Sequence, residues 1–142
     1  MKEHSCFIDT NIFLRVLLED DPEKFEDCIK FLNKVKKGKI KGFTSNLILA
    51  EVNWTLLRLF KFPKDRVIKG IASILNLKNL KIKDNFDSYL ALKIYKESSV
   101  KFIDALIASN PKIYRGDIIL ISYDKDFDKI KGIIRKEPKE ML

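Results

Sequence analysis

Short apolar runs alternate along this chain with longer segments in which apolar residues recur every three or four positions. The short runs are typical of buried β-strands, and the longer segments are typical of amphipathic helices. Strands are predicted at residues 6–8, 40–44, 80–82, 117–122 and 130–134. The strand at 117–122 is the strongest, because its centre is continuously apolar, as expected for a parallel strand covered on both faces.

Helix boundaries are marked by capping residues and by breakers. Asp21 and Pro22 are typical of a helix start, and Gly38 follows the basic residues that end that helix. Ser45 is expected to cap a helix running to about residue 60, and Asp84 is expected to cap another. Further helices are predicted at residues 12–17, 67–75 and 102–108.

Strands that alternate with helices predict an α/β fold with a central, mostly parallel sheet flanked by helices. One domain is expected over residues 1–142, with a core at about 5–134 and a frayed tail at 136–142. In this class, ligands bind outside the carboxyl ends of the strands. Residues 9–11 and 122–126 each follow an apolar strand, so they are expected to face one another across one crevice.

Several acidic residues stand in apolar surroundings. Asp9 follows the first strand, Asp124 and Asp126 follow the strongest one, and Glu51 and Asp104 are lone charges within apolar helical runs. Asp9 and Asp124 could be helix N-caps, and Glu51 could be an exposed charge on an amphipathic helix. Asp104 fits an ordinary role least, because a buried carboxylate is costly unless it is paired or bound to metal.

Carboxylates that converge on one point repel one another, by roughly 4 kcal/mol for two charges ~4 Å apart at an effective dielectric of 20. A divalent cation removes that repulsion. With carboxylate donors and no cluster of His or Cys, Mg²⁺ or Mn²⁺ is favoured over Zn²⁺. Such an ion can activate water for attack on a phosphodiester.

The overall charge is compatible with a nucleic-acid partner. Lys and Arg number 28 against 20 Asp and Glu, which gives a net charge of +8 and a pI near 9.4. A basic protein attracts polyanions such as RNA or DNA. The lysines are spread along the whole chain, so a lysine-rich composition bias explains the charge equally well.

Other features bear on location and on rival functions. Cys6 and Cys28 lie in apolar stretches and are expected to be buried thiols. No signal-peptide pattern and no apolar run near ~20 residues is present, so a cytoplasmic protein without membrane contact is the simplest interpretation. Residues 124–128 begin like a calcium-binding EF-hand loop, but Lys129 and Arg135 stand where Gly and Glu are required. Phosphate-binding glycine motifs are absent, and the single His makes a His-dependent triad implausible.

Four segments of the chain resemble the PIN-domain family, and within it the VapC-type toxins of bacterial and archaeal toxin–antitoxin pairs. The resemblance covers residues 5–134, and its specificity comes from the order and spacing of the segments. They are residues 7–11, 45–52, 102–108 and 122–127. The resemblance implies that four acidic residues bind Mg²⁺ or Mn²⁺ and are catalytic. They are Asp9, Glu51, Asp104 and Asp124.

The resemblance also implies roles for neighbouring residues. Asn11 would orient Asp9 or a water on the metal, and Ser122 would support the far side, where the family often has Thr. Both Asp124 and Asp126 occur in the family's last motif. Asp124 is favoured as the closer ligand because it lies nearer the strand end, and Asp126 is expected to support it.

The function implied by the resemblance is that of a metal-dependent endoribonuclease, as the toxin of a type II pair. A homodimer and neutralisation by a cognate antitoxin are implied as well. The alternatives are a PIN-domain nuclease of RNA processing and a catalytically silent module that binds RNA or protein. A phosphotransfer receiver is disfavoured because the first motif offers only Asp9. The RNA target, the preferred metal and the antitoxin are left open.

Overall fold

The computed structural model describes residues 4–142, and its strands form a single sheet in the order β3-β2-β1-β4-β5. Every neighbouring pair of strands is parallel. The predicted α/β class with a mostly parallel sheet is therefore confirmed. The strands are β1 (Ser5–Ile8), β2 (Lys41–Thr44), β3 (Leu80–Ile82), β4 (Ile119–Ile121) and β5 (Arg135–Lys136).

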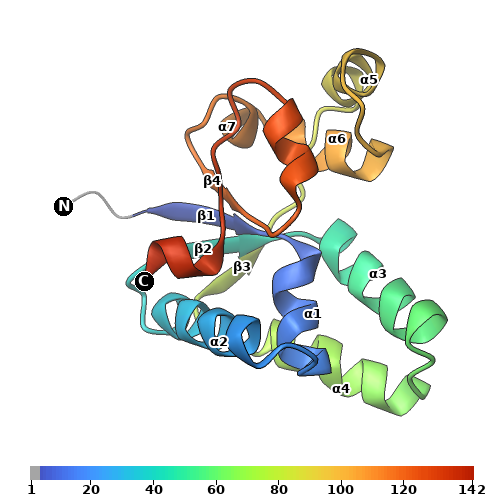
Figure 1. Ribbon diagram of the computed structural model, residues 1–142, viewed down its shortest axis with the longest axis vertical. Coiled ribbons are helices and arrows are strands. Elements are labelled where there is room, and N and C mark those ends of the chain that lie inside the picture. The colour runs from blue at the N-terminus through green and yellow to red at the C-terminus, as the bar shows by residue number, and fades with distance from the viewer. Residues whose placement is uncertain (1–3) are drawn as a thin grey trace.

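Helices cover both faces of the sheet. Figure 1 shows α1, α2 and α4 on one side of the strands and α5, α6 and α7 on the other. The helices are α1 (Thr10–Leu18), α2 (Pro22–Lys36), α3 (Asn46–Trp54), α4 (Lys64–Leu75), α5 (Ser88–Glu97), α6 (Phe102–Ala108) and α7 (Pro111–Tyr114). The core between the layers contains fully buried side chains that include Ile8, Phe31, Leu120, Ile121 and Phe127. No helix within residues 4–142 has the length and apolarity to cross a bilayer.

The predicted helix starts are correct in two cases and wrong in one. Asp21 accepts a hydrogen bond from the Lys24 backbone N–H, and Ser45 accepts one from Ile48. Asp84 does not cap α5, whose N-cap is Asp87. Asp84 instead accepts a hydrogen bond from the Asn46 backbone N–H at the start of α3. Its carboxylate therefore pairs with an N–H group that has no partner within that helix.

The carboxyl-terminal segment is more ordered than the pattern of apolar residues predicts. The expected strand at 130–134 is displaced to β5, and residues Pro138–Met141 form a 3-10 helix in place of a frayed tail. The Ser122 N–H donates to the Lys136 carbonyl, and Lys34 of α2 donates to the Met141 carbonyl. This edge strand is held by backbone pairing with β4, which leaves little apolar signal in the sequence.

Both cysteines are buried and free, as predicted. Burial raises the pKa of the Cys6 thiol to about 12 and that of the Cys28 thiol to about 11. Since the thiolate is the reactive form, neither side chain is suited to nucleophilic chemistry.

The packing of α2 against β2 requires a glycine at position 42. A Cβ at Gly42 would lie 2.6 Å from Cγ1 of Val35, a fully buried and β-branched side chain with little freedom to move. We expect Gly42→Ala to lower the free energy of unfolding by about 1 to 3 kcal/mol, measured by urea denaturation.

Gly70→Ala is the matched control for that substitution. Gly70 lies within α4, and its added Cβ would meet the flexible end of Leu17 at 3.2 Å. Alanine stabilises a helix interior by roughly 0.5 to 1 kcal/mol relative to glycine, which offsets the small displacement of Leu17. Equal stability of the two variants would contradict this account of the α2–β2 packing.

Candidate active site

The two polar segments that follow β1 and β4 lie side by side at the carboxyl end of the sheet. These strands are neighbours, and the Asp9 backbone N–H donates to the Ile121 carbonyl at 3.0 Å. Two residues further along each segment, the Tyr123 N–H donates to the Asn11 side-chain oxygen at 3.1 Å. The expectation that residues 9–11 and 122–126 face one another is therefore correct.

Asp9 is buried and is held in one orientation by three donors. Its Oδ1 accepts a hydrogen bond from the Thr10 N–H at 2.8 Å, as the N-cap of α1. Its Oδ2 accepts one from the Ser122 hydroxyl at 2.6 Å and one from the Asn11 amide at 3.2 Å. Asp9 is thus both a helix cap and one of the acidic residues that line the pocket described below.

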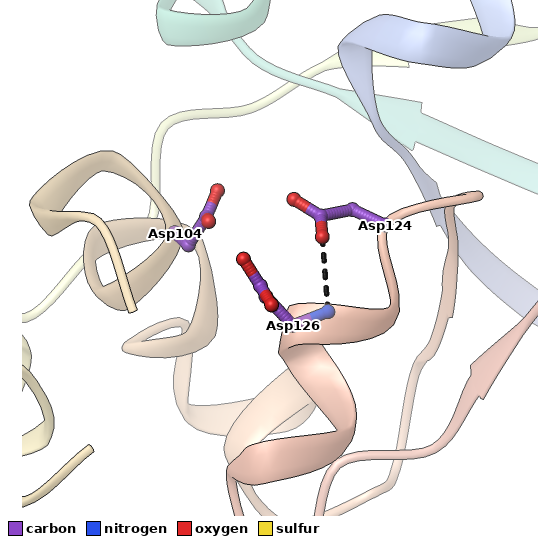
Figure 2. Close-up of side chains that lie close together, drawn as sticks. All are labelled: Asp104, Asp124 and Asp126. Carbon is purple, nitrogen blue, oxygen red and sulfur yellow. Dashed lines mark hydrogen bonds between the residues drawn. The ribbon is translucent and has the colours of Figure 1, made fainter. Parts of the chain in front are cut away.

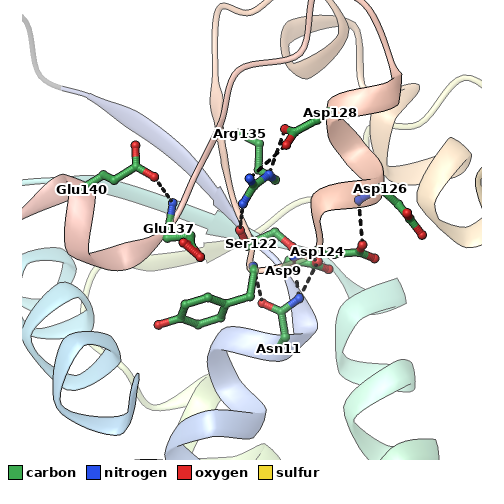
Figure 3. A network of polar contacts seen from close by, with 10 residues as sticks. Asp9, Asn11, Ser122, Asp124, Asp126, Asp128, Arg135, Glu137 and Glu140 are labelled. Carbon is green, nitrogen blue, oxygen red and sulfur yellow. Dashed lines mark hydrogen bonds and ion pairs between the residues drawn. The ribbon is translucent and has the colours of Figure 1, made fainter. Parts of the chain in front are cut away.

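Ser122 connects the two sides of this network. Its hydroxyl donates to Asp9 and accepts hydrogen bonds from the Asn11 amide and from the Asp124 N–H, each at 3.0 Å. Asp124 in turn accepts a hydrogen bond at 2.9 Å from the Asp126 N–H. Figure 3 shows this chain of contacts running from α1 to the segment after β4.

Asp124 also belongs to a group of three carboxylates that lie close together. One oxygen from each of Asp104, Asp124 and Asp126 lies within 4.8 Å of the others, and Figure 2 shows the three side chains pointing inward from α6 and from the segment after β4. Asp126 also forms an ion pair at 3.1 Å with Lys129, and both side chains are partly exposed to solvent. Asp104 is buried.

All four predicted catalytic acids line one pocket of about 180 Å³. Glu51 enters it from α3, where its carboxylate accepts a hydrogen bond from the Thr10 hydroxyl. Of the four predicted ligands, Asp104 and Asp124 belong to the group of three carboxylates above, and Asp9 and Glu51 lie outside it. The residues that line the pocket are Asp9, Thr10, Asn11, Leu14, Glu51, Thr55, Lys101, Ile103, Asp104 and Asp124.

The acidic side chains perturb one another electrostatically. Burial is the main cause that raises the pKa of Asp104 from 3.8 to about 7, and the charges of Asp124 and Asp9 add to it. Burial likewise raises the pKa of Asp9 to about 6, against the opposing effect of the Ser122 hydrogen bond. Groups with such raised pKa values in a pocket are typical of functional sites.

The pocket fits a divalent cation that prefers oxygen ligands. Within residues 4–142, Asp104 Oδ2 is the buried side-chain polar atom that has no hydrogen-bond partner. A buried carboxylate oxygen without a donor is costly, and a cation coordinated there would compensate it. The neighbouring side-chain ligands are carboxylates, which suits Mg²⁺ or Mn²⁺.

The pocket also contains residues that the sequence pattern did not single out. Thr10 orients Glu51, and Lys101 is the cation among the pocket-lining residues. Lys101 precedes α6 and opposes the rise in the pKa of Asp104. The one sequence signal for Lys101 is its position three residues before Asp104, close to one helical turn, and lysines are too frequent in this chain for that to stand out.

Comparison with known proteins identifies a family and related folds. The family model described as PIN domain matches residues 6–133. VapBC2 from Rickettsia felis, solved with a promoter DNA fragment, matches with a TM-score of 0.68 and 18% identity over 94% of this chain and 98% of that one. PAE2754 from Pyrobaculum aerophilum matches with a TM-score of 0.66 and 15% identity, over 98% and 92% of the two chains.

A third solved structure is VapC20 from Mycobacterium tuberculosis, described as a sarcin–ricin loop cleaving toxin. It matches with a TM-score of 0.62 and 18% identity, over 94% of this chain and 99% of that one. A search of curated protein sequences found no match. At these identities the structural similarity establishes the shared fold.

The raised pKa of Asp104 predicts a pH-dependent loss of stability in the metal-free protein. The folded-state pKa of about 7 exceeds the ordinary value of 3.8, so the folded protein binds this proton more tightly than the unfolded chain does. The resulting stabilisation is fully present below pH 3.8 and is lost as the pH rises through 7. Asp104→Asn removes the charge, and we expect it to raise the free energy of unfolding by about 1 to 3 kcal/mol at pH 8.

Urea denaturation in a chelator, at pH 5 and at pH 8, measures this effect. The gain is expected to be smaller at pH 5, and Mn²⁺ is expected to stabilise the wild type more than the variant. Glu97→Gln, an exposed change at the end of α5, is the control for loss of one carboxylate. An Asp104→Asn variant less stable than the wild type at pH 8 would disprove the electrostatic argument.

Proposed function

This chain belongs to the PIN-domain family, and from that membership and its acidic pocket we propose that it is a metal-dependent endoribonuclease. The observation that carries the proposal is the partnerless buried oxygen of Asp104, which lies in a pocket shared with three other carboxylates. A site arranged for the stability of the metal-free protein would give this oxygen a donor.

In this proposal Mg²⁺ or Mn²⁺ is held by the four acids that line the pocket, Asp9, Glu51, Asp104 and Asp124. A divalent cation bound there would offset charge on a phosphodiester and help to activate water for in-line attack. The protein's own contribution is orientation. Ser122 and Asn11 hold Asp9, Thr10 holds Glu51, and the Asp126 N–H holds Asp124.

The substrate in this proposal is RNA, recognised first through its phosphates. The protein carries a net charge of +8, while its pocket is acidic. Lysines around an acidic centre can bind the phosphodiester backbone while the carboxylates hold the metal. Lys101 is the lysine best placed to bind a phosphate beside the metal site in this proposal. It lines the pocket with Asp104 and forms no ion pair among the described residues.

We further propose that the protein is the toxin of a type II toxin–antitoxin pair. Support comes from its structural similarity to VapBC2 of R. felis and to VapC20 of M. tuberculosis. A cognate antitoxin and a homodimer are part of this proposal. A role in RNA processing, without an antitoxin, is the alternative.

The two aspartates after β4 are expected to differ in importance. Asp124 lines the pocket, whereas Asp126 is engaged by Lys129 at the edge of the cluster. We expect Asp124→Asn to reduce Mn²⁺-dependent RNA cleavage more than about 100-fold and Asp126→Asn by about 10-fold. Cleavage of a fluorescent RNA measures both variants.

The same pair of variants tests the toxin proposal in cells. Expression of the wild type is expected to arrest growth, and expression of Asp124→Asn is not. Undiminished cleavage by a folded Asp124→Asn variant would rule out the proposed mechanism. Cleavage by the wild type without growth arrest would favour RNA processing.

Lys101→Ala is expected to weaken RNA binding and to leave the cation bound. Loss of one phosphate contact should lower the slope of log affinity against log salt by about 1. Mn²⁺ affinity should be unchanged or higher, because a positive charge beside Asp104 is removed. RNA binding and Mn²⁺ titration, each at several salt concentrations, measure these opposite effects.

The control is Lys96→Ala, an exposed change in the last turn of α5 that lies outside the pocket. Since it removes the same net charge, it separates a local contact from the general attraction of a basic protein. Equal salt slopes for the two variants would contradict a specific role for Lys101.

A further inference from the structure

Arg135 connects β5 to two points in the segment that carries Asp124 and Asp126. Its Nε and Nη2 donate to the two carboxylate oxygens of Asp128 at 2.9 and 3.0 Å. Its Nη1 donates to the Ser122 carbonyl at 2.9 Å. The Arg135 side chain is 11% exposed, so the guanidinium is largely withdrawn from water. Figure 3 shows it above Ser122, between the strand end and the turn of Asp128.

The two partners of Arg135 lie on either side of the candidate ligands in the sequence. Residues 122–128 leave β4 at Ser122, pass through Asp124 and Asp126, and reach Asp128 within the 3-10 helix Lys125–Lys129. We call residues 122–128 the ligand segment. A short 3-10 helix has weak hydrogen bonds of its own, so its position depends on contacts from outside.

In the absence of a cation, the carboxylates of the ligand segment are repelled by that of Asp104. The segment presents Asp124 and Asp126 to the buried Asp104 of α6, and like charges at this separation repel. The fully buried side chain of Phe127 anchors the segment in the core. The start of the segment is also held, because Ser122 donates to Asp9 and the Tyr123 N–H donates to Asn11. Arg135 adds an attachment at the far end, through Asp128.

We propose that Arg135 is a positioning residue that, through Asp128 and the Ser122 carbonyl, fixes the ligand segment so that Asp124 and Asp126 face Asp104. The inference rests on the proposed function for what the site binds. A guanidinium suits the task because its planar fork makes two parallel bonds to one carboxylate and still offers a third N–H to a carbonyl. A lysine ammonium keeps the charge but not this geometry.

Arg135→Lys and Arg135→Ala test the proposal in the metal-free protein and in the metal-bound one. We expect either change to weaken Mn²⁺ binding about 10- to 100-fold, measured by calorimetry, with little recovery in the lysine variant. Faster hydrogen exchange is expected at the Asp124 and Asp126 amides, whose acceptors are Ser122 and Asp124. NMR of the protein in the presence of a chelator measures that exchange in the metal-free state.

Two control variants separate positioning from stability. Val35→Ala opens space at a fully buried position in α2 and should destabilise the whole domain, yet leave Mn²⁺ affinity intact. Arg115→Ala removes an arginine–aspartate pair that is exposed and does not line the pocket, so it should change neither stability nor Mn²⁺ affinity.

Wild-type affinity for Mn²⁺ in a folded Arg135→Lys variant would overturn the proposal. So would unchanged exchange at the Asp124 and Asp126 amides, whatever the metal affinity. If the wild type itself binds no divalent cation, the proposed function fails, and the exchange measurement still decides whether Arg135 fixes the ligand segment. The failures of the two proposals are therefore distinguishable.

Discussion

Electrostatic repulsion among carboxylates is the constraint around which this end of the sheet is organised. Asp9, Asp104 and Asp124 come from three separate stretches of the chain. The charges of Asp124 and Asp9 oppose ionisation of Asp104, and the charge of Asp124 opposes ionisation of Asp9. The parallel sheet brings Asp9 and Asp124 together, because β1 and β4 are neighbours and end at the same edge, and α6 adds Asp104. Something in the surrounding structure must therefore hold the side chains together against their charges.

Two kinds of attachment meet that demand. Asp9 and Asp124 are held by hydroxyl and backbone donors, so part of their charge is neutralised by dipoles that the fold already provides. Asp104 differs, since one of its oxygens is buried without a donor. The imbalance is local, and it lies at the point where three carboxylates come within 4.8 Å. A destabilising feature confined to one pocket is typical of a functional site.

The sequence was sufficient where local chemistry determines structure. Apolar runs predicted the sheet, and Asp104 stood out because a lone acid in an apolar helical run has few ordinary roles. It was insufficient where distant partners decide the outcome. Asp84 has the residue type of a helix cap but accepts a hydrogen bond from the first residue of α3, which Ser45 caps. Arg135 belongs to an edge strand with no apolar pattern. Their roles depend on which backbone groups lie nearby in space.

Capping and metal binding are compatible roles for a carboxylate, although the sequence presents them as alternatives. Asp9 caps α1 and Asp124 caps the 3-10 helix after β4, so the ordinary interpretation of both residues is correct. An ionised carboxylate has about four lone-pair sites. The cap occupies one of them in each residue, and in Asp9 the Ser122 and Asn11 donors occupy two more. The remaining sites can serve a cation, while the cap sets the direction in which they point. A helix start placed directly after a parallel strand therefore both anchors an acid and aims it outward from the sheet edge, which explains how short motifs at strand ends can specify a site.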